Sequence, residues 1–235
     1  MQRSMPLVLS LVILTAAPAF AREPIFVNPN QVHSFEILPP PPADTSDATK
    51  AELAELHKIE QARSQAEVKQ AVWDDENEHI FIFKDGLGEN FTEEKLPLVA
   101  AFGKRVRNDE GLNDAPAKEG FHRVRPYNLD KTLQPVCKTK TKDDSYPSGH
   151  ATSGYLLALT LIDMAPEKRD ALLARADAYG HNRLVCGVHY ASDIPASRLA
   201  AYAIHAAMAQ NPLYQTEMAA ARTELRAALG LPAAK

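Results

Sequence analysis

The chain has 235 residues, and its 26 lysines and arginines against 30 aspartates and glutamates give a formal net charge of −4. Hydrophobic residues make up 45% of the sequence, which is ordinary for a globular protein and excludes a disordered chain. The mild acidic balance argues against nucleic acid as a partner, because domains that bind nucleic acid usually carry a basic face. The length permits one domain or two small ones.

The first 21 residues have the pattern of a secretory signal peptide. Arg3 is the only charged residue before Arg22, residues 7–17 are apolar, and Ala19-Phe20-Ala21 supplies a small-x-small cleavage site. The apolar run is shorter than the roughly 20 residues that span a bilayer. An uncleaved anchor or an apolar tail is the alternative. We therefore expect export to the periplasm, and no membrane span in the mature form.

Export bears on the two cysteines of the chain, Cys137 and Cys186. In an oxidising compartment an even pair favours one disulfide bond, and two buried free thiols are the alternative. Two thiols without C-x-x-C spacing do not make a typical metal site. We expect neither a metal nor a cofactor.

Residues 22–46 form an arm rich in proline. The four consecutive prolines at 39–42 have no backbone N–H to donate and favour an extended conformation. The arm is expected to be an extended surface spacer, or a segment that packs along the body and helps to form a homo-oligomer.

Helix-forming residues predominate after the arm. They extend over 48–72, a second amphipathic segment follows over 72–83, and a third helix is expected over 92–106. Residues 107–146 are expected to be rich in loops, because they contain three prolines and a charged tract at 138–144.

The C-terminal half contains four further helical patterns. These are a strongly apolar one over 151–164, an amphipathic one over 168–179, a small apolar one over 196–209 and a closing one over 217–229. Strand-like alternation is scarce, and no repeat or domain boundary is visible. The sequence therefore predicts one all-α domain over 47–235, a helical bundle behind the N-terminal arm.

Three short blocks between residues 118 and 193 carry the candidate chemistry. In chain order they are K-x6-R-P from Lys118 to Pro126, P-S-G-H from Pro147 to His150, and R-x5-H-x3-D from Arg183 to Asp193. Each block alone is weak, since a lone histidine is more often structural than catalytic and basic residues usually lie on a solvated surface. The order and spacing of all three are more informative.

The basic residues of these blocks suit a phosphate group. Lys118, Arg125 and Arg183 would repel one another unless an anion lay between them, and arginine offers a planar fork for phosphate oxygens. Ser148 and Gly149 are expected at a helix N-terminus, where free N–H groups and the helix dipole favour an anion. The three blocks therefore predict a phosphate site that needs no metal.

Two histidines would stand beside this phosphate. Asp193 follows His189 by four residues, so its carboxylate can hold one ring N–H and leave the other nitrogen free to attack. His150 can donate a proton to the leaving oxygen. Nucleophile, orienting carboxylate, acid and cations together predict phosphoryl transfer.

The three blocks together resemble the motif of the type 2 phosphatidic acid phosphatase superfamily, which the vanadium haloperoxidases share. Ser145–His150, Leu38–Pro42 and Val185-Cys186-Gly187 are similar to the bacterial class A non-specific acid phosphatases. The resemblance implies an all-helical, metal-independent, periplasmic and often oligomeric enzyme. Its members hydrolyse many phosphomonoesters at acid pH, and some transfer phosphate to alcohols.

The resemblance also implies a role for each site residue. His189 would form a phosphohistidine, Asp193 would orient it, and His150 would act as general acid and then activate water. The phosphoryl oxygens would be bound by the remaining residues of the blocks, namely Lys118, Arg125, Ser148, Gly149 and Arg183.

Two positions depart from the family pattern. Asn182 stands where a serine is usual, and Ala151 where a threonine is common. Neither position supplies a charge or the nucleophile, so the departures bear on specificity more than on the reaction. Three histidines that match no block are expected to be structural or on the surface; they are His122, His181 and His205.

Other functions remain open at this point. A lipid phosphatase or phosphotransferase of the same superfamily, a haloperoxidase, and a phosphate-binding protein without turnover are the alternatives. A pure binder would have no use for the two histidines, and haloperoxidase chains are typically much longer. The sequence therefore favours a secreted acid phosphatase that acts on small phosphomonoesters.

Overall fold

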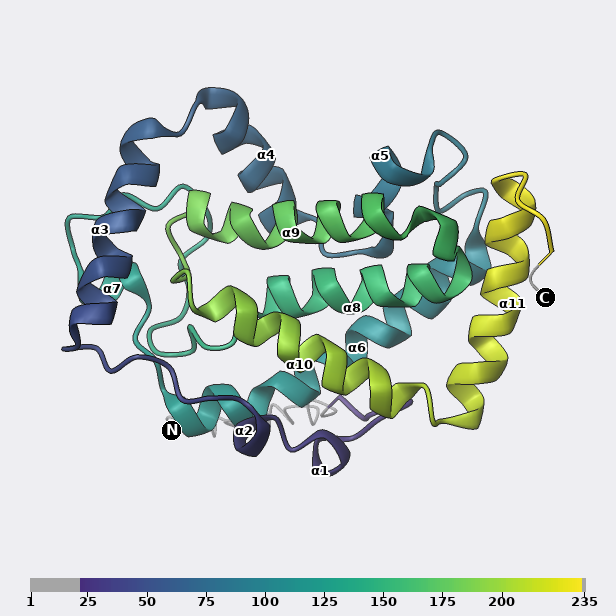
Figure 1. Ribbon diagram of the computed structural model, residues 1–235, viewed down its shortest axis with the longest axis horizontal. Helices are drawn as coiled ribbons and strands as arrows, with labels where there is room; N and C mark the ends of the chain where they lie inside the picture. The colour runs from purple at the N-terminus through teal and green to yellow at the C-terminus, as the bar shows by residue number, and fades with distance from the viewer. Residues whose placement is uncertain (1–21, 234–235) are drawn as a thin grey trace, which may run out of the picture.

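The computed structural model describes residues 22–233, and all the regular elements in that range are helices (Figure 1). The predicted signal peptide, residues 1–21, lies outside the described residues. In chain order the elements are α1 (Pro29–Val32), α2 (Ser34–Ile37), α3 (Asp47–Ala62), α4 (Gln65–Glu76), η1 (Ile80–Phe83), α5 (Lys84–Leu87), α6 (Pro97–Phe121), α7 (Pro126–Leu129), α8 (Gly149–Met164), η2 (Pro166–Lys168), α9 (Arg169–Val185), α10 (Asp193–Met208) and α11 (Pro212–Ala228). The prediction of an all-α, single-domain protein is confirmed.

Helix α8 is the centre of the bundle. It packs against α6, α9, α10 and α11, and α9 and α10 flank it in Figure 1. Leucines on several of its faces are fully buried, as expected for a helix that is apolar all round. Gly154 allows the close approach of α9, because a Cβ there would lie 2.7 Å from the ring of Tyr179. This packing fixes the N-terminus of α8.

The N-terminal arm packs on the body rather than standing free. The backbone N–H groups of Ile25, Phe26 and Val27 donate to the buried carboxylate of Asp109 on α6, at 2.8, 2.6 and 2.9 Å. The ring of Phe26 packs edge-on against Tyr214 of α11. Of the two alternatives for the arm, the structure shows the segment that lies along the bundle.

The arm also differs from its predicted extended form. It contains two single-turn helices, α1 and α2, and α1 begins with a capping box in which Asn28 and Gln31 satisfy each other's backbone N–H groups. The composition of the arm pointed to proline-rich coil, and this local hydrogen bonding was missed. The prolines at 39–42 lie outside any helix, as expected.

Helix α6 is the largest departure from the sequence prediction. A helix was expected over 92–106 and loops from 107 onward, but α6 extends over Pro97–Phe121 and includes Pro116. Val99, Val106 and Ala117 are buried along it, so the packing of its inner face outweighs the hydrogen bond that the proline removes. Lys118 is therefore held on a helix instead of a loop.

The other predicted helical segments are found in part or with shifted ends, and residues 72–83 are not one segment, because α4 ends at Glu76 and η1 covers Ile80–Phe83. The segment 48–72 is two helices, because Ser64 caps a new helix with Glu67 as its partner. Helices α8, α10 and α11 lie where the apolar patterns predicted them. Helix α9 continues six residues beyond the predicted end, to Val185, and so carries Arg183. Within residues 22–233, no helix combines the length and apolarity that crossing a membrane requires.

The predicted disulfide bond between Cys137 and Cys186 is present. It joins the loop after α7 to the residue that caps α9. Beside it, the guanidinium of Arg63 donates to the carbonyls of Val185 and Gln134, both at 2.7 Å. The bond thus ties the loop 138–144 to the end of α9.

The double substitution Cys137→Ala/Cys186→Ala is expected to lower the free energy of unfolding. The bond closes a sequence separation of 49 residues. Without the bond the unfolded chain gains conformational entropy, which lowers the free energy of unfolding by about 4 kcal/mol for a loop of this size. Urea denaturation of the oxidised wild type and the variant measures the difference. Reduced wild type should match the variant, and equal stability of all three would contradict the prediction.

Candidate active site

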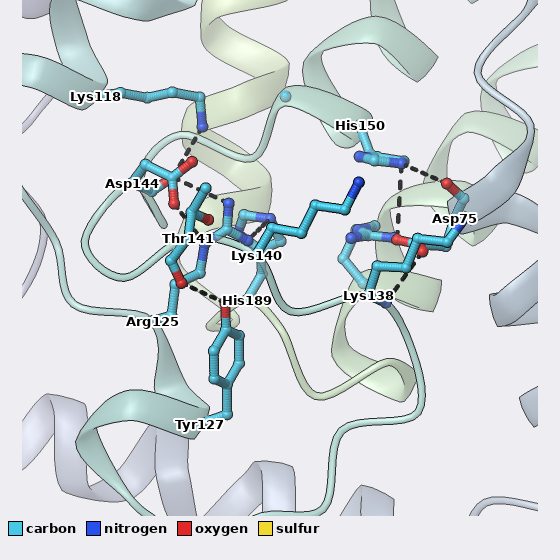
Figure 2. A pocket seen from close by; sticks show the side chains of 12 residues that line it. Asp75, Lys118, Arg125, Tyr127, Lys138, Lys140, Thr141, Asp144, His150 and His189 are labelled. Atoms are coloured by element: carbon cyan, nitrogen blue, oxygen red, sulfur yellow. Dashed lines mark hydrogen bonds and ion pairs between the residues drawn. The ribbon is translucent and has the colours of Figure 1, made fainter. Parts of the chain in front are cut away.

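A pocket of about 310 Å³ lies at the end of the bundle where α8 begins and α9 ends (Figure 2). It brings together most of the predicted site residues, namely Lys118, Arg125, Gly149, His150, Arg183 and His189. Ser148 and Asp193, the other two, are fully buried behind its wall. The three sequence blocks therefore converge on one place, although α6, α8 and α9 each carry a different part of it.

His189 lies at the floor of the pocket and is almost fully buried. Its Nδ1 lies 3.0 Å from Oδ2 of Asp193, the first residue of α10. Its Nε2 lies 2.8 Å from the guanidinium of Arg125, which can only donate. The tautomer that satisfies both contacts carries its proton on Nδ1 and presents a lone pair on Nε2 to the pocket.

Asp193 is held by more than the histidine. Its Oδ1 accepts from Arg123 at 2.6 Å, and its Oδ2 accepts from the hydroxyl of Ser145 at 2.7 Å. Arg123 in turn donates to Glu52 of α3 at 2.7 Å and stacks over the ring of Tyr190. A buried acid–base–acid row thus stands behind His189 and fixes its orientation.

His150 is on the first turn of α8, across the pocket from His189. Its ring stacks on Tyr179 at 6.2 Å between centroids. Its Nε2 lies 3.2 Å from the carbonyl oxygen of Asp75, and its Nδ1 lies 3.2 Å from Oε1 of Glu78. Glu78 also pairs with Arg107. Both ring nitrogens therefore face oxygen acceptors.

Burial and positive charge depress the pKa of both histidines. Burial and then the Arg183 cation lower the pKa of His150 to about 3. Burial and then Arg125, Arg183 and Lys118 lower the pKa of His189 well below its ordinary value. In the unliganded pocket both rings are neutral at moderate pH, because a further cation there is unfavourable.

Each cation of the pocket has a fixed anchor. Nε of Arg125 donates to the carboxylate of Asp144 at 2.8 Å, and Nη1 of Arg183 donates to that of Asp75 at 2.8 Å. Nζ of Lys118 donates to the carbonyls of Asp144 and Pro147. Burial alone would raise the pKa of Asp144, but the hydrogen bond from Arg125 holds it below its ordinary value.

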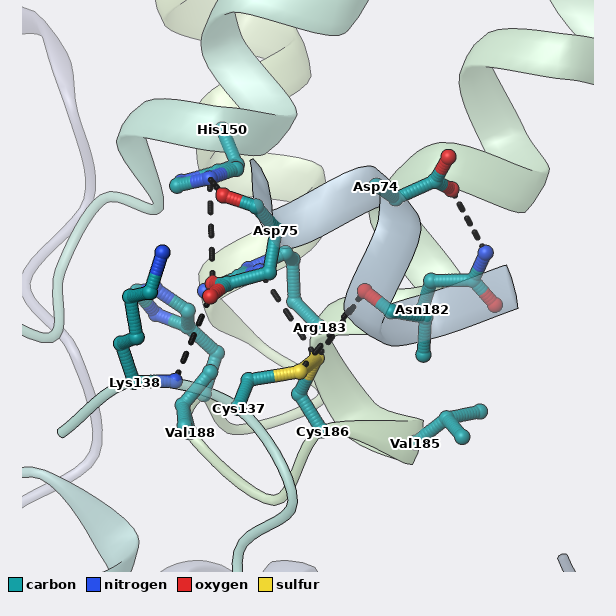
Figure 3. Close-up of a disulfide and its surroundings, with 12 residues drawn as sticks. Asp74, Asp75, Cys137, Lys138, His150, Asn182, Arg183, Val185, Cys186 and Val188 are labelled. Atoms are coloured by element: carbon teal, nitrogen blue, oxygen red, sulfur yellow. Dashed lines mark hydrogen bonds and ion pairs between the residues drawn. A yellow bond between two sulfur atoms is a disulfide. The ribbon is translucent and has the colours of Figure 1, made fainter. Parts of the chain in front are cut away.

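The disulfide bond lies directly behind Arg183 (Figure 3). Nη1 of Arg183 lies 3.7 Å from Sγ of Cys186, and the backbone N–H of Lys138, next to Cys137, donates to Oδ2 of Asp75 at 3.2 Å. Asp75 thus links the guanidinium of Arg183 to the loop 138–144. The covalent bond holds both of these partners in place.

Ser148 differs from the other predicted phosphate ligands. It is the residue that caps α8, and its hydroxyl accepts from the N–H of Ala151 at 3.4 Å. Its own N–H donates to the hydroxyl of Ser197 at 2.8 Å. Ser148 thus caps the helix from behind the pocket wall, while Gly149 lines the pocket itself, and a role of Ser148 in binding phosphate stays a prediction.

The positions that depart from the family pattern lie outside the pocket wall. Nδ2 of Asn182 donates to the buried carboxylate of Asp74 at 2.6 Å, and Arg175 pairs with the same carboxylate (Figure 3 shows the first contact). Ala151 is fully buried on α8. Both side chains therefore contact residues behind the pocket and do not line it.

His122, His181 and His205 also lie away from the pocket. His122 is exposed and lies 3.4 Å from Asp143, and His205 pairs with Asp163 at 2.9 Å. His181 is exposed on α9. None of them is among the residues that line the described pocket.

Several residues of the site were missed by the sequence analysis. Asp75 and Glu78 flank His150, and Arg123 and Glu52 support Asp193. Arg123 lies inside the first block, and the other three lie far from the blocks: Glu52 on α3, Asp75 near the end of α4 and Glu78 just after it. Only Arg123 had a sequence signal, its place two residues before Arg125, and that signal is shared by many basic loops.

Two buried carboxyl groups lie on α6 below the pocket. Glu110 and Asp114 precede Lys118 by two turns and one turn of the helix, and neither is accessible enough to be solvated. Burial raises the pKa of Asp114 to about 6, and burial together with Asp114 raises that of Glu110 well above its ordinary value. The folded protein therefore favours their protonated forms.

Asp114→Asn is expected to change how stability depends on pH. An acid whose pKa is higher when folded stabilises the fold below about pH 4, and that contribution is lost as pH rises through about 6. Between pH 4 and pH 8, the free energy of unfolding of the wild type should therefore fall by about 3 kcal/mol relative to that of the variant. Denaturant titrations at both pH values measure this, with the exposed Asp170→Asn as control. A difference independent of pH would contradict it.

Comparison with known proteins agrees with this fold. The PAP2 superfamily matches residues 110–217, which include all three blocks. The non-specific acid phosphatase of Providencia stuartii is 31% identical over 206 residues, 84% of this chain and 82% of the relative. That of Salmonella typhimurium is 30% identical over 224 residues, 92% of this chain and 90% of the relative. An acid phosphatase of Zymomonas mobilis is 31% identical over 199 residues, 81% of this chain and 75% of the relative.

Two solved structures share the fold at low sequence identity. A bacterial vanadium-dependent iodoperoxidase aligns with a TM-score of 0.57 at 16% identity, over 78% of this chain and 58% of that one. A transmembrane PAP2-type phosphatidylglycerolphosphate phosphatase from Bacillus subtilis aligns with a TM-score of 0.50 at 17% identity, over 70% and 86%. Fold and relatives together define a helical hydrolase of phosphate esters. The chain belongs to the PAP2 superfamily, and within it to the acid phosphatases.

Proposed function

We propose that this acid phosphatase hydrolyses phosphomonoesters without a metal, through a phosphohistidine on His189. The observation that supports it is the buried pair of His189 and Asp193 at 3.0 Å, with Nε2 facing a pocket lined by Lys118, Arg125 and Arg183. A pocket that only bound phosphate would need the cations and not an oriented histidine. The phosphoryl group would lie between the three cations and the N-terminus of α8.

The reaction would proceed in two displacements. Nε2 of His189 attacks phosphorus while the bond from phosphorus to the ester oxygen breaks, and His150 gives its proton to that oxygen. His150, now neutral, takes a proton from water, which attacks the phosphohistidine and releases inorganic phosphate and free His189. Nη1 of Arg125 lies 2.8 Å from Nε2 of His189, so its guanidinium must move aside onto the phosphoryl oxygens.

We propose that the proton on His150 arrives with the substrate. Burial and then the Arg183 cation lower the pKa of His150 to about 3, which favours a neutral ring before the ester binds. A phosphate monoester that binds as its monoanion can pass that proton to His150 and become the dianion between the cations. The dianion and Glu78, which lies 3.2 Å from Nδ1, then stabilise the imidazolium.

Metal independence is proposed from the same site. Among residues 22–233, one grouping of ligand-type side chains is close enough to hold an ion, and it consists of Asp75 with Cys137 and Cys186. Both sulfurs are used by the disulfide bond. The positive charge at a phosphate would come instead from the three basic side chains.

We also propose that the chain is exported to the periplasm and cleaved before Arg22. The disulfide bond supports this, since such bonds persist in oxidising compartments. Mass spectrometry of the protein from a periplasmic extract tests it. A mature N-terminus at Arg22 supports export, and full-length protein retained in the cytoplasm would contradict it.

His189→Ala is expected to lower kcat toward p-nitrophenyl phosphate by about 10⁴-fold or more, because the nucleophile is lost. Asp193→Asn should lower it by roughly 10²- to 10⁴-fold, because the wrong tautomer is favoured. Acid-quenched labelling with radioactive substrate should give a phosphorylated wild type and an unlabelled His189 variant. EDTA should leave wild-type turnover unchanged.

Control measurements separate folding from chemistry in these variants. Far-ultraviolet circular dichroism and the thermal midpoint should show that both variants are folded, and His122→Ala, on the surface, should keep full turnover. Labelled protein in the His189 variant would refute the assignment of the nucleophile. Activity that EDTA removes and zinc or magnesium restores would refute the metal-free mechanism.

The pH at which activity falls on the alkaline side is expected to depend on the second pKa of the substrate's phosphate group. Since the required proton enters on the ester, kcat/KM should fall above the second pKa of the phosphate group, which is about 6. An aryl phosphate has a lower second pKa than an alkyl phosphate, so its limb should lie at lower pH. Rates for the two esters across pH 4–9 measure this. If the rates for both esters fall at the same pH, the titrating group belongs to the enzyme and not to the substrate.

A further inference from the structure

The pocket carries more positive charge than one phosphoryl group requires. Its cationic side chains are Lys118, Arg125, Lys138, Lys140 and Arg183. Its carboxylates are Asp75 and Asp144, and each is already bound to an arginine at 2.8 Å. A phosphoryl group bound by Lys118, Arg125 and Arg183 would therefore leave unused the two lysines of the loop 138–144 that line the pocket, Lys138 and Lys140.

The two loop lysines are not equivalent. Lys138 pairs with Glu76 at 3.3 Å, in an exposed position. Lys140 has no ion-pair partner among residues 22–233, although it lines the same pocket. In Figure 2 its side chain extends across the mouth of the pocket toward His150. Lys140 is thus the cation that is free to meet a ligand.

The loop that carries Lys140 is anchored on both sides of it. Before it, the backbone N–H of Lys138 donates to Asp75 at 3.2 Å, next to the disulfide bond. After it, the carbonyl of Thr141 accepts from the hydroxyl of Tyr127 at 2.7 Å and from Nδ2 of Asn128 at 3.2 Å. The backbone at Lys140 is therefore placed before any ligand binds, which lowers the entropy lost on binding.

The direction of the reaction places Lys140 on the leaving-group side. In phosphoryl transfer the attacking and leaving atoms lie roughly in line on opposite sides of phosphorus. With Nε2 of His189 on one side, the leaving oxygen lies toward His150, and atoms beyond that oxygen come toward Lys140. A substrate whose leaving group is itself anionic would meet this lysine.

We propose that Lys140 binds a second phosphate carried by the leaving group, so that the enzyme favours organic diphosphates over monophosphates with an uncharged leaving group. This inference rests on the proposed function for the position of the reacting phosphoryl group. A leaving phosphate also needs less help from a proton donor than an alkoxide does, so the same subsite suits a site in which His150 is hard to protonate.

Adenosine 5′-diphosphate and adenosine 5′-monophosphate are matched probes, because the terminal phosphate leaves from an anionic group in one and from a neutral alcohol in the other. In Lys140→Gln, the ratio of kcat/KM for the diphosphate to that for the monophosphate should fall about fivefold from the wild-type value, and further in Lys140→Glu. Lys142→Gln removes a charge from the same tract outside the pocket lining and should keep the wild-type ratio.

Binding of methylenediphosphonate, measured by calorimetry, separates the subsite from the mechanism. Its dissociation constant should rise about fivefold in Lys140→Gln and stay unchanged in Lys142→Gln, whatever nucleophile the enzyme uses. Equal ratios and equal dissociation constants in wild type and Lys140→Gln would overturn the subsite. An unlabelled wild-type enzyme in the phosphohistidine experiment, with the calorimetric difference intact, would overturn the proposed mechanism alone.

Discussion

The carboxylate of Asp193 is the interaction on which the site depends. It is fully buried, and it is shared between Nδ1 of His189, the guanidinium of Arg123 and the hydroxyl of Ser145. A buried carboxylate without such partners would be costly, and each partner comes from a different part of the chain. The contact between α10, the loop before α8 and the segment after α6 is therefore specified electrostatically as well as by packing.

The pocket on the other side of His189 has a different balance of charges. There the cations outnumber the carboxylates, since five basic side chains line the pocket together with two carboxylates, Asp75 and Asp144. Burial and these cations lower the pKa of both His150 and His189, so their neutral forms are favoured. The charges behind the wall are thus fully paired, and in the proposed mechanism the affinity for phosphate would come from the excess of cations in front of it. His189 contacts both regions, Asp193 through Nδ1 and Arg125 through Nε2.

The sequence predicted the all-α fold, the disulfide bond and the residues that meet in the pocket, because each of these has a local signal: apolar periodicity, an even cysteine count or a spaced motif. It did not predict that α6 passes through Pro116, since the burial of Val106 and Ala117 depends on helices distant in the chain. Asp75, Glu78 and Glu52 were missed for a similar reason. A single acidic residue in a polar segment has no pattern that separates it from a solvated one.

The disulfide bond connects two elements that would contact the substrate in the proposed mechanism, Arg183 at the end of α9 and the loop that carries Lys140. If the chain is exported as proposed, the bond forms only after translocation. Precursor molecules in the reducing cytoplasm would then have neither element locked in position. Oxidation would act as the maturation step of the catalyst, and the phosphate esters of the cytoplasm would be spared from an indiscriminate hydrolase during its synthesis.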